Sequence, residues 1–389
     1  MTGRARRFLI ALPIRVACLV AIWHCYRIAL ADRLSREPTE ESLRAAIAAR
    51  PNHFQYYWQL SRIPSPESRQ LLEKAIQLNP YNAGPMVDLA TLLEYQGDTN
   101  QSEQLLLRAN QVDRTFFPKW SLVNFYLRRD RQEEFWQWAR RAVDVGAEDL
   151  VSLFSLCHRL ESDPATVAAR VLSDRPQAIW AYLSFLNGRA IIPPRDLCLR
   201  AIPSADEART PILLQVIDGM LGKERLDDAT AVWSSLVAAK LAPKDLTVFT
   251  ATPTARGFDW RYHLNETDLL LTHREDGLEV TVGGKQAESV LVAERVVVMN
   301  PSSRYRVAYR YRTADLSTAG GIRWRMALNG RTVDGPSFRP SGETSGQFLV
   351  ETGPKERLGR LQFVCVRELG TTRSKGTVML ESVRLEHLD

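Results

Sequence analysis

An internal repeat of 33 to 34 residues constrains the fold of this chain more than any other feature of its sequence. Three segments, LLEKAIQLNP, LLLRANQVDR and WARRAVDVGA, align on Ala75, Ala109 and Ala142, which lie 34 and 33 residues apart. A repeat of this length is typical of helix pairs that cannot bury their apolar faces alone and therefore stack on one another. The period predicts a solenoid of helix pairs with an extended concave surface.

The repeat also places particular residue types where paired helices need them. Leu89-Ala90 lies on a first helix, Gly97-Asp98 at the turn, and Ala109 on a second helix. Asn79-Pro80 ends the preceding unit. Small residues let two helices approach closely, and proline ends a helix because it has no amide hydrogen to donate. On these positions the unit Ala83–Arg114 resembles the tetratricopeptide repeat family.

This resemblance covers residues 38–150 well and residues 150–246 poorly, and a last second helix is expected at Leu226–Lys240. It implies a surface that binds extended peptides or partner proteins. The third unit is unusually aromatic, and Phe135 replaces its expected small residue. Aromatic residues at helical spacing form either a bulky core between repeats or a groove that stacks on a peptide or glycan. The candidate groove residues are Trp120, Tyr126 and Trp136.

The chain changes character between Pro243 and Gly257, where Thr, Pro and Gly predominate, and alternation of period two follows. Several short strands separated by turn residues predict an antiparallel β-sandwich or jelly roll. The expected strands are Gly277–Val282, Ser289–Met299, Arg304–Thr313, Ile322–Leu328, Gln347–Glu351, Arg360–Arg367 and Thr377–Glu386.

Two of these strands carry arginines on one face. In RYRVAYRYRT and IRWRMAL the arginines alternate with tyrosine, valine and other apolar residues, so they point away from them. If the two strands are neighbours, one sheet face holds Arg304, Arg306, Arg310, Arg312, Arg323 and Arg325. Such a face is either solvated, with its arginines paired to acids of adjacent strands, or it is a binding site for an anion or sugar. The second alternative follows because guanidinium groups match carboxylate and phosphate oxygens.

Residues 256–389 resemble the galactose-binding-like jelly-roll superfamily, which includes many carbohydrate-binding modules. The likeness is carried by GFDWRY at Gly257–Tyr262 as the opening strand, by Asn300–Thr313, and by the closing strand Gly376–Glu386 with its acid Glu381. It implies a sandwich and, less specifically, sugar binding.

The whole arrangement resembles bacterial membrane-anchored tetratricopeptide proteins with a carbohydrate-binding-like C-terminal domain. Asn124–Arg129, Phe135–Ala142 and Gly370–Leu380 carry this likeness. It implies a scaffold at the cell envelope that holds a protein partner and takes part in assembly or export of surface polysaccharide. The alternatives are a protein–protein adaptor with a structural sandwich and, less favoured, an enzyme of glycan metabolism.

The N-terminal segment resembles a membrane-targeting sequence. Three arginines precede residue 8, and residues 8–31 are mostly apolar, although Arg15 and Arg27 interrupt them. The pattern favours a signal anchor that spans the inner membrane once and leaves residues 32–389 on the periplasmic side. The alternatives are a signal peptide cleaved near Ala29-Leu30-Ala31 and a soluble protein with an apolar first helix. The expected organisation is therefore an anchor over residues 1–34, helical repeats over residues 35–246 and a β-sandwich over residues 247–389.

Motifs of catalysis are not apparent. The sequence has no glycine-rich phosphate loop, no G-x-S-x-G and no H-E-x-x-H, so neither an enzyme nor a cofactor or metal is expected. His263 and His273 flank Glu266 and Asp268, but this spacing is not diagnostic of a metal site. The net charge of +6 arises largely in the first 36 residues, which argues against a nucleic-acid partner. The five cysteines are expected to be buried, with a Cys157–Cys198 bridge as the alternative if the domain is exported.

Overall fold

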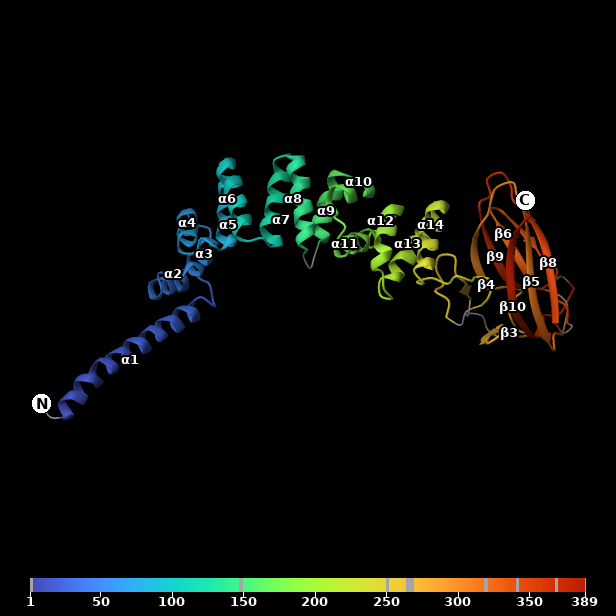
Figure 1. The fold of residues 1–389 in the computed structure, drawn as a ribbon, viewed down its shortest axis with the longest axis horizontal. Helices are drawn as coiled ribbons and strands as arrows, with labels where there is room; N and C mark the ends of the chain where they lie inside the picture. Colours follow the sequence, from blue (N-terminus) through green and yellow to red (C-terminus); the bar gives the residue numbers. More distant parts are fainter. Residues whose placement is uncertain are drawn as a thin grey trace. The chain divides into compact units, whose positions relative to one another are not determined.

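The chain forms two compact units, Met1–Ala178 and Ile179–Asp389, in a computed structural model (Figure 1). The structure describes residues 3–146, 150–249, 252–263, 269–317, 321–340, 343–367 and 370–388. The side chains of residues 3–14 and 343 are outside this description.

The first unit is helical throughout. Its helices are α1 Gly3–Leu34, α2 Glu40–Ala49, α3 Phe54–Ser61, α4 Ser68–Leu78, α5 Ala83–Tyr95, α6 Thr99–Val112, α7 Phe116–Arg128, α8 Gln132–Val145, α9 Val151–Leu160 and α10 Pro164–Val171. Helix α11, Pro176–Asn187, crosses into the second unit. The helix pairs α3–α4, α5–α6 and α7–α8 pack together, so the predicted array of helix pairs is confirmed.

The repeated alanines have the role that their spacing predicts. Ala75, Ala109 and Ala142 lie on α4, α6 and α8, the second helices of three successive pairs, and each is fully buried. The turn between α5 and α6 depends on Gly97, whose φ of +90° is one that residues with a side chain rarely adopt. Asp98 then caps α6 by accepting a hydrogen bond from the Gln101 amide at 3.2 Å. A small contact residue thus recurs in each pair, and in the α5–α6 pair a glycine turn connects the two helices.

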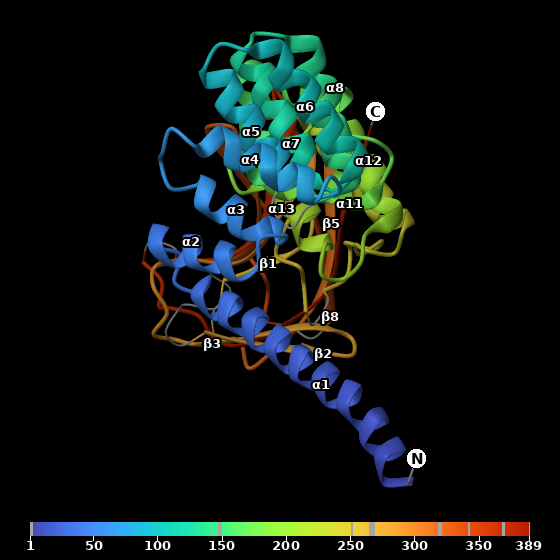
Figure 2. The ribbon, with the colours of Figure 1, turned by 90° about the vertical axis from the view of Figure 1, so that its left-hand side faces the viewer.

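The prediction of a membrane-spanning helix is wrong, and with it the expected single-pass placement in the inner membrane. Among the described residues, no helix combines the length and apolar character that crossing a membrane requires. Helix α1 has 32 residues, but Arg15 and Arg27 interrupt its apolar sequence, and charged side chains are costly within a bilayer. Figure 2 shows its C-terminal part beside α2. There Ala31 packs with Ala46 and Tyr56 in a small buried cluster.

The second unit begins with helices and ends with the sandwich. Its helical part continues from α11 through α12 Arg195–Ala201, the short 3₁₀ helix η1 Ile202–Ser204, α13 Thr210–Gly222 and α14 Leu226–Ala238. Its strands are β1 Arg261–Tyr262, β2 Leu269–Arg274, β3 Gly277–Gly283, β4 Ser289–Val298, β5 Arg304–Ala314, β6 Ile322–Leu328, β7 Arg331–Asp334, β8 Glu343–Glu351, β9 Leu358–Val366 and β10 Lys375–His387.

The strands form two five-stranded sheets, and every pairing is antiparallel. The first sheet has the order β1-β4-β9-β6-β7 and the second has the order β2-β3-β10-β5-β8. The fold class is therefore α followed by β, as expected apart from the spanning helix. All seven predicted strands are present, and β1 lies within the opening strand expected at Gly257–Tyr262, whereas β2 and β7 were not predicted. Helical sequence and strand sequence both belong to this one compact unit.

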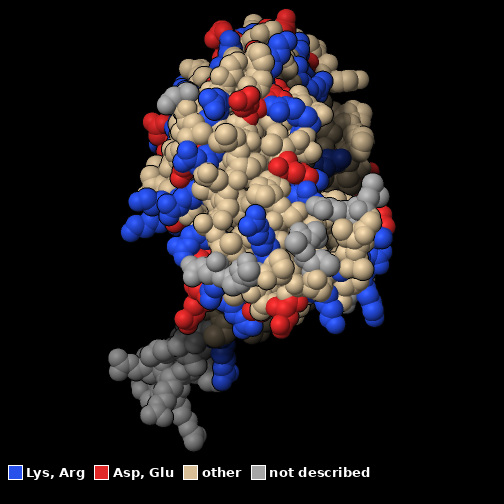
Figure 3. Space-filling model, turned by 90° about the vertical axis from the view of Figure 1, so that its right-hand side faces the viewer, with Lys and Arg blue, Asp and Glu red and all other residues tan. Residues whose placement is uncertain are grey.

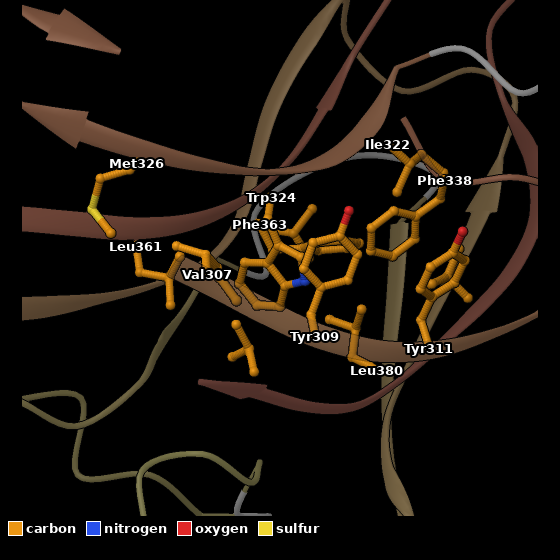
Figure 4. Packing of buried hydrophobic residues seen from close by; sticks show 14 of the residues in the cluster. Val307, Tyr309, Tyr311, Ile322, Trp324, Met326, Phe338, Leu361, Phe363 and Leu380 are labelled. Carbon is orange, nitrogen blue, oxygen red and sulfur yellow. The ribbon is translucent and has the colours of Figure 1, made fainter. Parts of the chain in front are cut away.

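The core of the sandwich lies between the two sheets and is rich in aromatic residues. Trp260 and Trp324 are completely buried, with ring centroids 5.9 Å apart. Tyr311 of β5 stacks on Phe338 at 3.7 Å, and Phe363 of β9 also contacts Phe338 (Figure 4). The tyrosines that alternate with arginine in β5 therefore fill the core and leave the arginines on the outer face.

Candidate functional site

A groove on the helical array is the first candidate site. It has a volume of about 500 Å³ and lies between α5 and α7, with Leu106 of α6 at its base. Aromatic side chains on its rim stay exposed: Tyr95 is 91% exposed and Phe117 is 46% exposed. Trp120 lines the same groove and stacks on Phe116 at 6.0 Å. Large aromatic surfaces that remain in water are uncommon on a stable helix and point to a contact with another molecule.

An ion cluster closes one end of the groove. Arg128 donates two hydrogen bonds to the carboxylate of Glu94, at 3.1 and 2.7 Å, and Arg129 approaches the same carboxylate at 3.2 Å. Burial by itself would raise the pKa of Glu94, but the hydrogen bonds and charges of the two arginines outweigh it and lower that pKa. Since two cations share one anion, the cluster keeps a net positive charge.

Polar groups of α5 and α7 line the rest of the groove. The hydroxyls of Thr91 and Ser121 donate to carbonyls one turn back on their own helices, at 2.9 and 3.0 Å. The Asn124 side-chain nitrogen likewise donates to the Trp120 carbonyl at 2.8 Å. Their oxygens keep lone pairs with which to accept hydrogen bonds. The groove therefore offers acceptors along its length and arginine donors at one end.

Only one of the three predicted groove residues lies in this groove. Trp120 lines it, whereas Tyr126 and Trp136 are 3% and 6% exposed and belong to the core between repeats. The Tyr126 hydroxyl donates to Glu103 at 2.8 Å, and burial, followed by this bond, raises the pKa of Tyr126 to about 12. Trp136 lies beneath the guanidinium of Arg170 at 5.1 Å.

The groove residues that sequence reasoning missed share one helical face. On α7 they recur as Phe117, Ser121, Asn124 and Arg128, which are spaced by three or four residues. This spacing alone does not reveal a groove, because polar positions on one helix face are also what a solvated surface shows. The informative signal is Tyr95, an aromatic residue two positions before the glycine of a turn.

The outer faces of the sandwich separate the six predicted arginines. Strand β5 belongs to one sheet and β6 to the other, so the two strands are not neighbours. Arg304, Arg306, Arg310 and Arg312 therefore lie on one outer face, and Arg323 and Arg325 lie on the opposite one. The single face of six arginines, which required adjacent strands, is not formed.

Acids of adjacent strands pair with each of these arginines. Glu381, whose side chain is 15% exposed, approaches Arg312 at 2.7 Å and Arg310 at 3.3 Å. On the opposite face Arg325 makes two hydrogen bonds to Asp334, at 2.6 and 3.0 Å. The remaining pairs are Arg304–Glu351, Arg306–Glu386, Arg312–Asp276 and Arg323–Asp334. Interspersed charges of both signs are also visible on the face of the molecule in Figure 3.

A hollow of about 610 Å³ lies on the outer face of the sheet that contains β5. Its lining includes small residues, Ala308 of β5, Gly346 of β8 and Ser382 of β10. Arg310 and Arg384 also line it. Within the described part of the chain, Arg384 has no carboxylate within 4 Å, unlike the paired arginines of β5. The hollow is the second candidate site because it combines the guanidinium of Arg384 with a floor of small residues, although the carboxylate of Glu386 also lines it.

Other sequence-based expectations concern metal and cysteine. Among residues with described placement, no group of three or more His, Cys, Asp or Glu could hold a metal ion. Of the possible cluster near His263, Glu266 and Asp268 lie outside the described residues. The Cys157–Cys198 bridge is not formed, since both cysteines are free thiols in apolar surroundings. Burial raises the pKa of both thiols to about 12.

No family model and no curated protein sequence matches this chain. Among solved structures, one described as "CBM4 structure and function" is similar over 37% of this chain and 94% of its own, at 10% identity and a TM-score of 0.26. YrrB, "a TPR protein with an unusual peptide-binding site", is similar over 43% of this chain and 92% of its own, at 15% identity and a TM-score of 0.23. The pilF protein of Pseudomonas aeruginosa is similar over 50% and 93%, at 18% identity and a TM-score of 0.26. Likenesses at this level establish no function for the chain.

Proposed function

We propose that this protein is a scaffold whose helical array binds an extended peptide segment of a partner protein. The observation that carries the proposal is the groove between α5 and α7, with exposed Tyr95 and Phe117 on its rim. Aromatic residues are enriched in protein interfaces and are frequent anchors of binding. Burying them against a partner would remove apolar surface from water, which is the main favourable term in such an association.

The polarity of the groove defines the segment that fits it. Arg128 and Arg129 together carry one more positive charge than Glu94 neutralises. A carboxylate of the partner is therefore complementary to this end of the groove. The aromatic rim suits an apolar or aromatic side chain farther along. The proposed ligand is an extended segment with an apolar anchor and an acidic residue.

A displayed library of short random peptides, selected against the full chain, tests this proposal. Peptides that bind are measured again on Tyr95→Ala and Phe117→Ala, which change exposed side chains and so leave the core intact. We expect each variant to weaken binding by about tenfold or more. Tyr81→Ala is the matched control, because Tyr81 is also 81% exposed but lies outside the groove, and it should change affinity by less than about twofold.

The selection also has outcomes that contradict the proposal. Selected peptides that bind both groove variants as well as the unchanged chain would place the binding surface elsewhere. If the selected peptides lack acidic residues and bind with an affinity independent of salt, the charged end of the groove does not contribute to peptide recognition. A chain that selects no peptide at all would leave the groove without this role.

The hollow beside Arg384 supports a second function, the binding of an acidic glycan. A guanidinium without a carboxylate partner presents its full set of donors to a uronate, and the floor of small residues leaves room for a sugar ring. Calorimetric titration of the full chain with oligomers of a uronic acid and of glucose tests this function. Arg384→Ala should weaken uronate binding by about tenfold, whereas Arg325→Ala, on the other sheet, should not.

Absence of binding to both oligomers would leave the alternative, a protein–protein adaptor whose sandwich is structural. The role in polysaccharide assembly or export, which the resemblance implies, stays a prediction. The expectation that the chain is not an enzyme also stays a prediction, and nothing in the proposed function requires a catalytic step.

A further inference from the structure

A third cavity, open to solvent, lies on the second unit where α14 meets the sandwich. It has a volume of about 290 Å³ and is largely apolar. Trp233 of α14, Phe258 and Leu246 of the connecting segments, Val297 of β4 and Leu385 of β10 all contribute to its wall. The charged side chain in this wall is Arg295 of β4. An apolar cavity with one charged group in its wall is the general form of a site for a small amphipathic molecule.

Arg295 is buried without a partner. It is 9% exposed, and its Nε is a buried donor that reaches no acceptor in the described part of the chain. No carboxylate of these residues lies within 4 Å of its guanidinium, which rests over the Trp260 ring at 5.4 Å. A buried cation without an ion pair is rare because its desolvation is not compensated.

The two acids whose charge acts on Arg295 are held by other groups. Asp259 accepts hydrogen bonds from the Thr254 amide at 2.7 Å and from the Trp260 amide at 2.8 Å. Asp245 accepts from the amide and the hydroxyl of Thr247, at 2.8 and 2.6 Å. These acids influence Arg295 through their charge but do not bind it. Burial lowers the pKa of Arg295 to about 10, so the side chain remains cationic at neutral pH.

The backbone of β4 directs the Arg295 side chain toward the core of the sandwich. A β-bulge between Leu291 and Ala293 shifts the alternation of the strand, so that Ala293 and Val297 both face the core. Arg295, midway between them, therefore faces inward, while Glu294 faces outward and binds Arg360. Without the bulge, the glutamate would have the inner position. Bulges that re-aim a side chain are found beside functional sites.

We propose that this cavity binds a small amphipathic carboxylate, with its anionic group on Arg295 and its apolar part against Trp233, Phe258 and Val297. A carboxylate satisfies the guanidinium with paired hydrogen bonds, which no group of the described chain does. The volume has room for about ten water-sized groups, which limits the ligand to about ten non-hydrogen atoms. The proposal is independent of the peptide groove and of the glycan hollow.

Titration of the full chain with octanoate and phenylacetate, each compared with its uncharged amide, tests this site. We expect at least one carboxylate to bind in the sub-millimolar range, and its amide to bind about tenfold more weakly or worse. Isothermal calorimetry measures both, and the Trp233 and Trp260 fluorescence should change with the same dissociation constant.

Two variants and one control separate the contribution of the charge from that of the cavity. Arg295→Met keeps the side-chain volume but removes the guanidinium, and it should abolish the preference for the carboxylate over its amide. Thr230→Phe fills the mouth of the cavity from an exposed position on α14 and should abolish binding of both, whereas Thr230→Ala should not. Thr230→Phe does not alter the core, so it remains informative if Arg295→Met fails to fold.

Three results would overturn the proposal. The first is no binding of either carboxylate at millimolar concentration, and the second is equal affinity for a carboxylate and its amide. The third is carboxylate binding that survives Thr230→Phe, which would place the ligand elsewhere on the chain.

Discussion

Asp218 is expected to join the last helices to the sandwich more strongly than any exposed ion pair of this unit. Its carboxylate, on α13, accepts hydrogen bonds from the Gly257 amide at 2.7 Å, from Arg261 at 2.9 Å and from Arg256 at 3.2 Å. Its side chain is 28% exposed and that of Arg261 is 20% exposed, so water screens the pair only partly. A hydrogen bond to a charged group contributes about 1.5–3 kcal/mol to stability. We therefore expect a coupling free energy of about 1.5–2 kcal/mol between Asp218 and Arg261.

The same unit contains a control pair with a different environment. Asp227 of α14 binds Arg357 at 2.6 Å, but the two side chains are 79% and 45% exposed. Exposed pairs contribute only about 0.2–1 kcal/mol. A double-mutant cycle with alanine at each position isolates the coupling in both pairs from other effects of the substitutions. For Asp227 and Arg357 the coupling should be the smaller one.

Hydrogen exchange is the suitable assay because the chain has two units. The free energy of opening, read from the slowest-exchanging amides of β9, reports the second unit without the first. The substitution Asp218→Ala should lower this free energy by about 2–3 kcal/mol, because it also leaves the Gly257 amide and Arg256 without their acceptor. Coupling of equal size in the two pairs, or below about 0.5 kcal/mol for Asp218 and Arg261, would refute the reasoning from burial.

Three further predictions follow from single contacts. Gly346→Ala should destabilise the sandwich by about 1–3 kcal/mol in chemical denaturation, because its new Cβ would lie 2.5 Å from the buried Tyr309 ring, whereas Gly222→Ala, with open space around it, should be neutral. Arginine partners lower the folded-state pKa of Glu94 despite burial. The stability that Glu94 contributes is therefore complete above its unfolded-state pKa near 4.5, and it is lost as the pH falls through the lower folded-state pKa. In a pH series of melting curves, Glu94→Gln should remove the part of the acid-induced loss of stability that Glu94 causes. Arg295→Met should not lower the melting temperature of the ligand-free chain, and a rise of a few degrees is expected because an unpaired buried charge is replaced by an apolar side chain.

The sequence predicts those features of the fold that depend on local periodicity. The 34-residue period locates Ala75, Ala109 and Ala142 because every pair brings the same small residue into the same close contact. The alternation in β5 correctly separates arginines from tyrosines, since neighbouring side chains of a strand point to opposite faces. The apolar N-terminal run, in contrast, was misleading, because its length suits a spanning helix but its interior arginines do not.

Features that depend on contacts between segments far apart in the sequence could not be predicted from local patterns. Arg310 and Arg325 lie on different sheets because the chain crosses from one sheet to the other between β5 and β6. No local pattern records such a crossing, since both strands alternate in the same way. Similarly, helical spacing groups Trp120 with Tyr126, but only the packing of neighbouring helices decides that the first lines a groove and the second is buried.

Arg295 shows how a small irregularity converts an ordinary strand into a candidate site. A regular strand from Ser289 to Val298 that buried Val290 and Val292 would continue inward with Glu294 and would leave Arg295 in solvent. The bulge adds one residue, and every later side chain changes face. The bulge buries a guanidinium that has no ion pair, and this burial destabilises a sandwich that binds nothing at this position. Burial of this charge is accounted for if a carboxylate from outside the chain completes the site, and the titrations with octanoate and its amide decide whether one does.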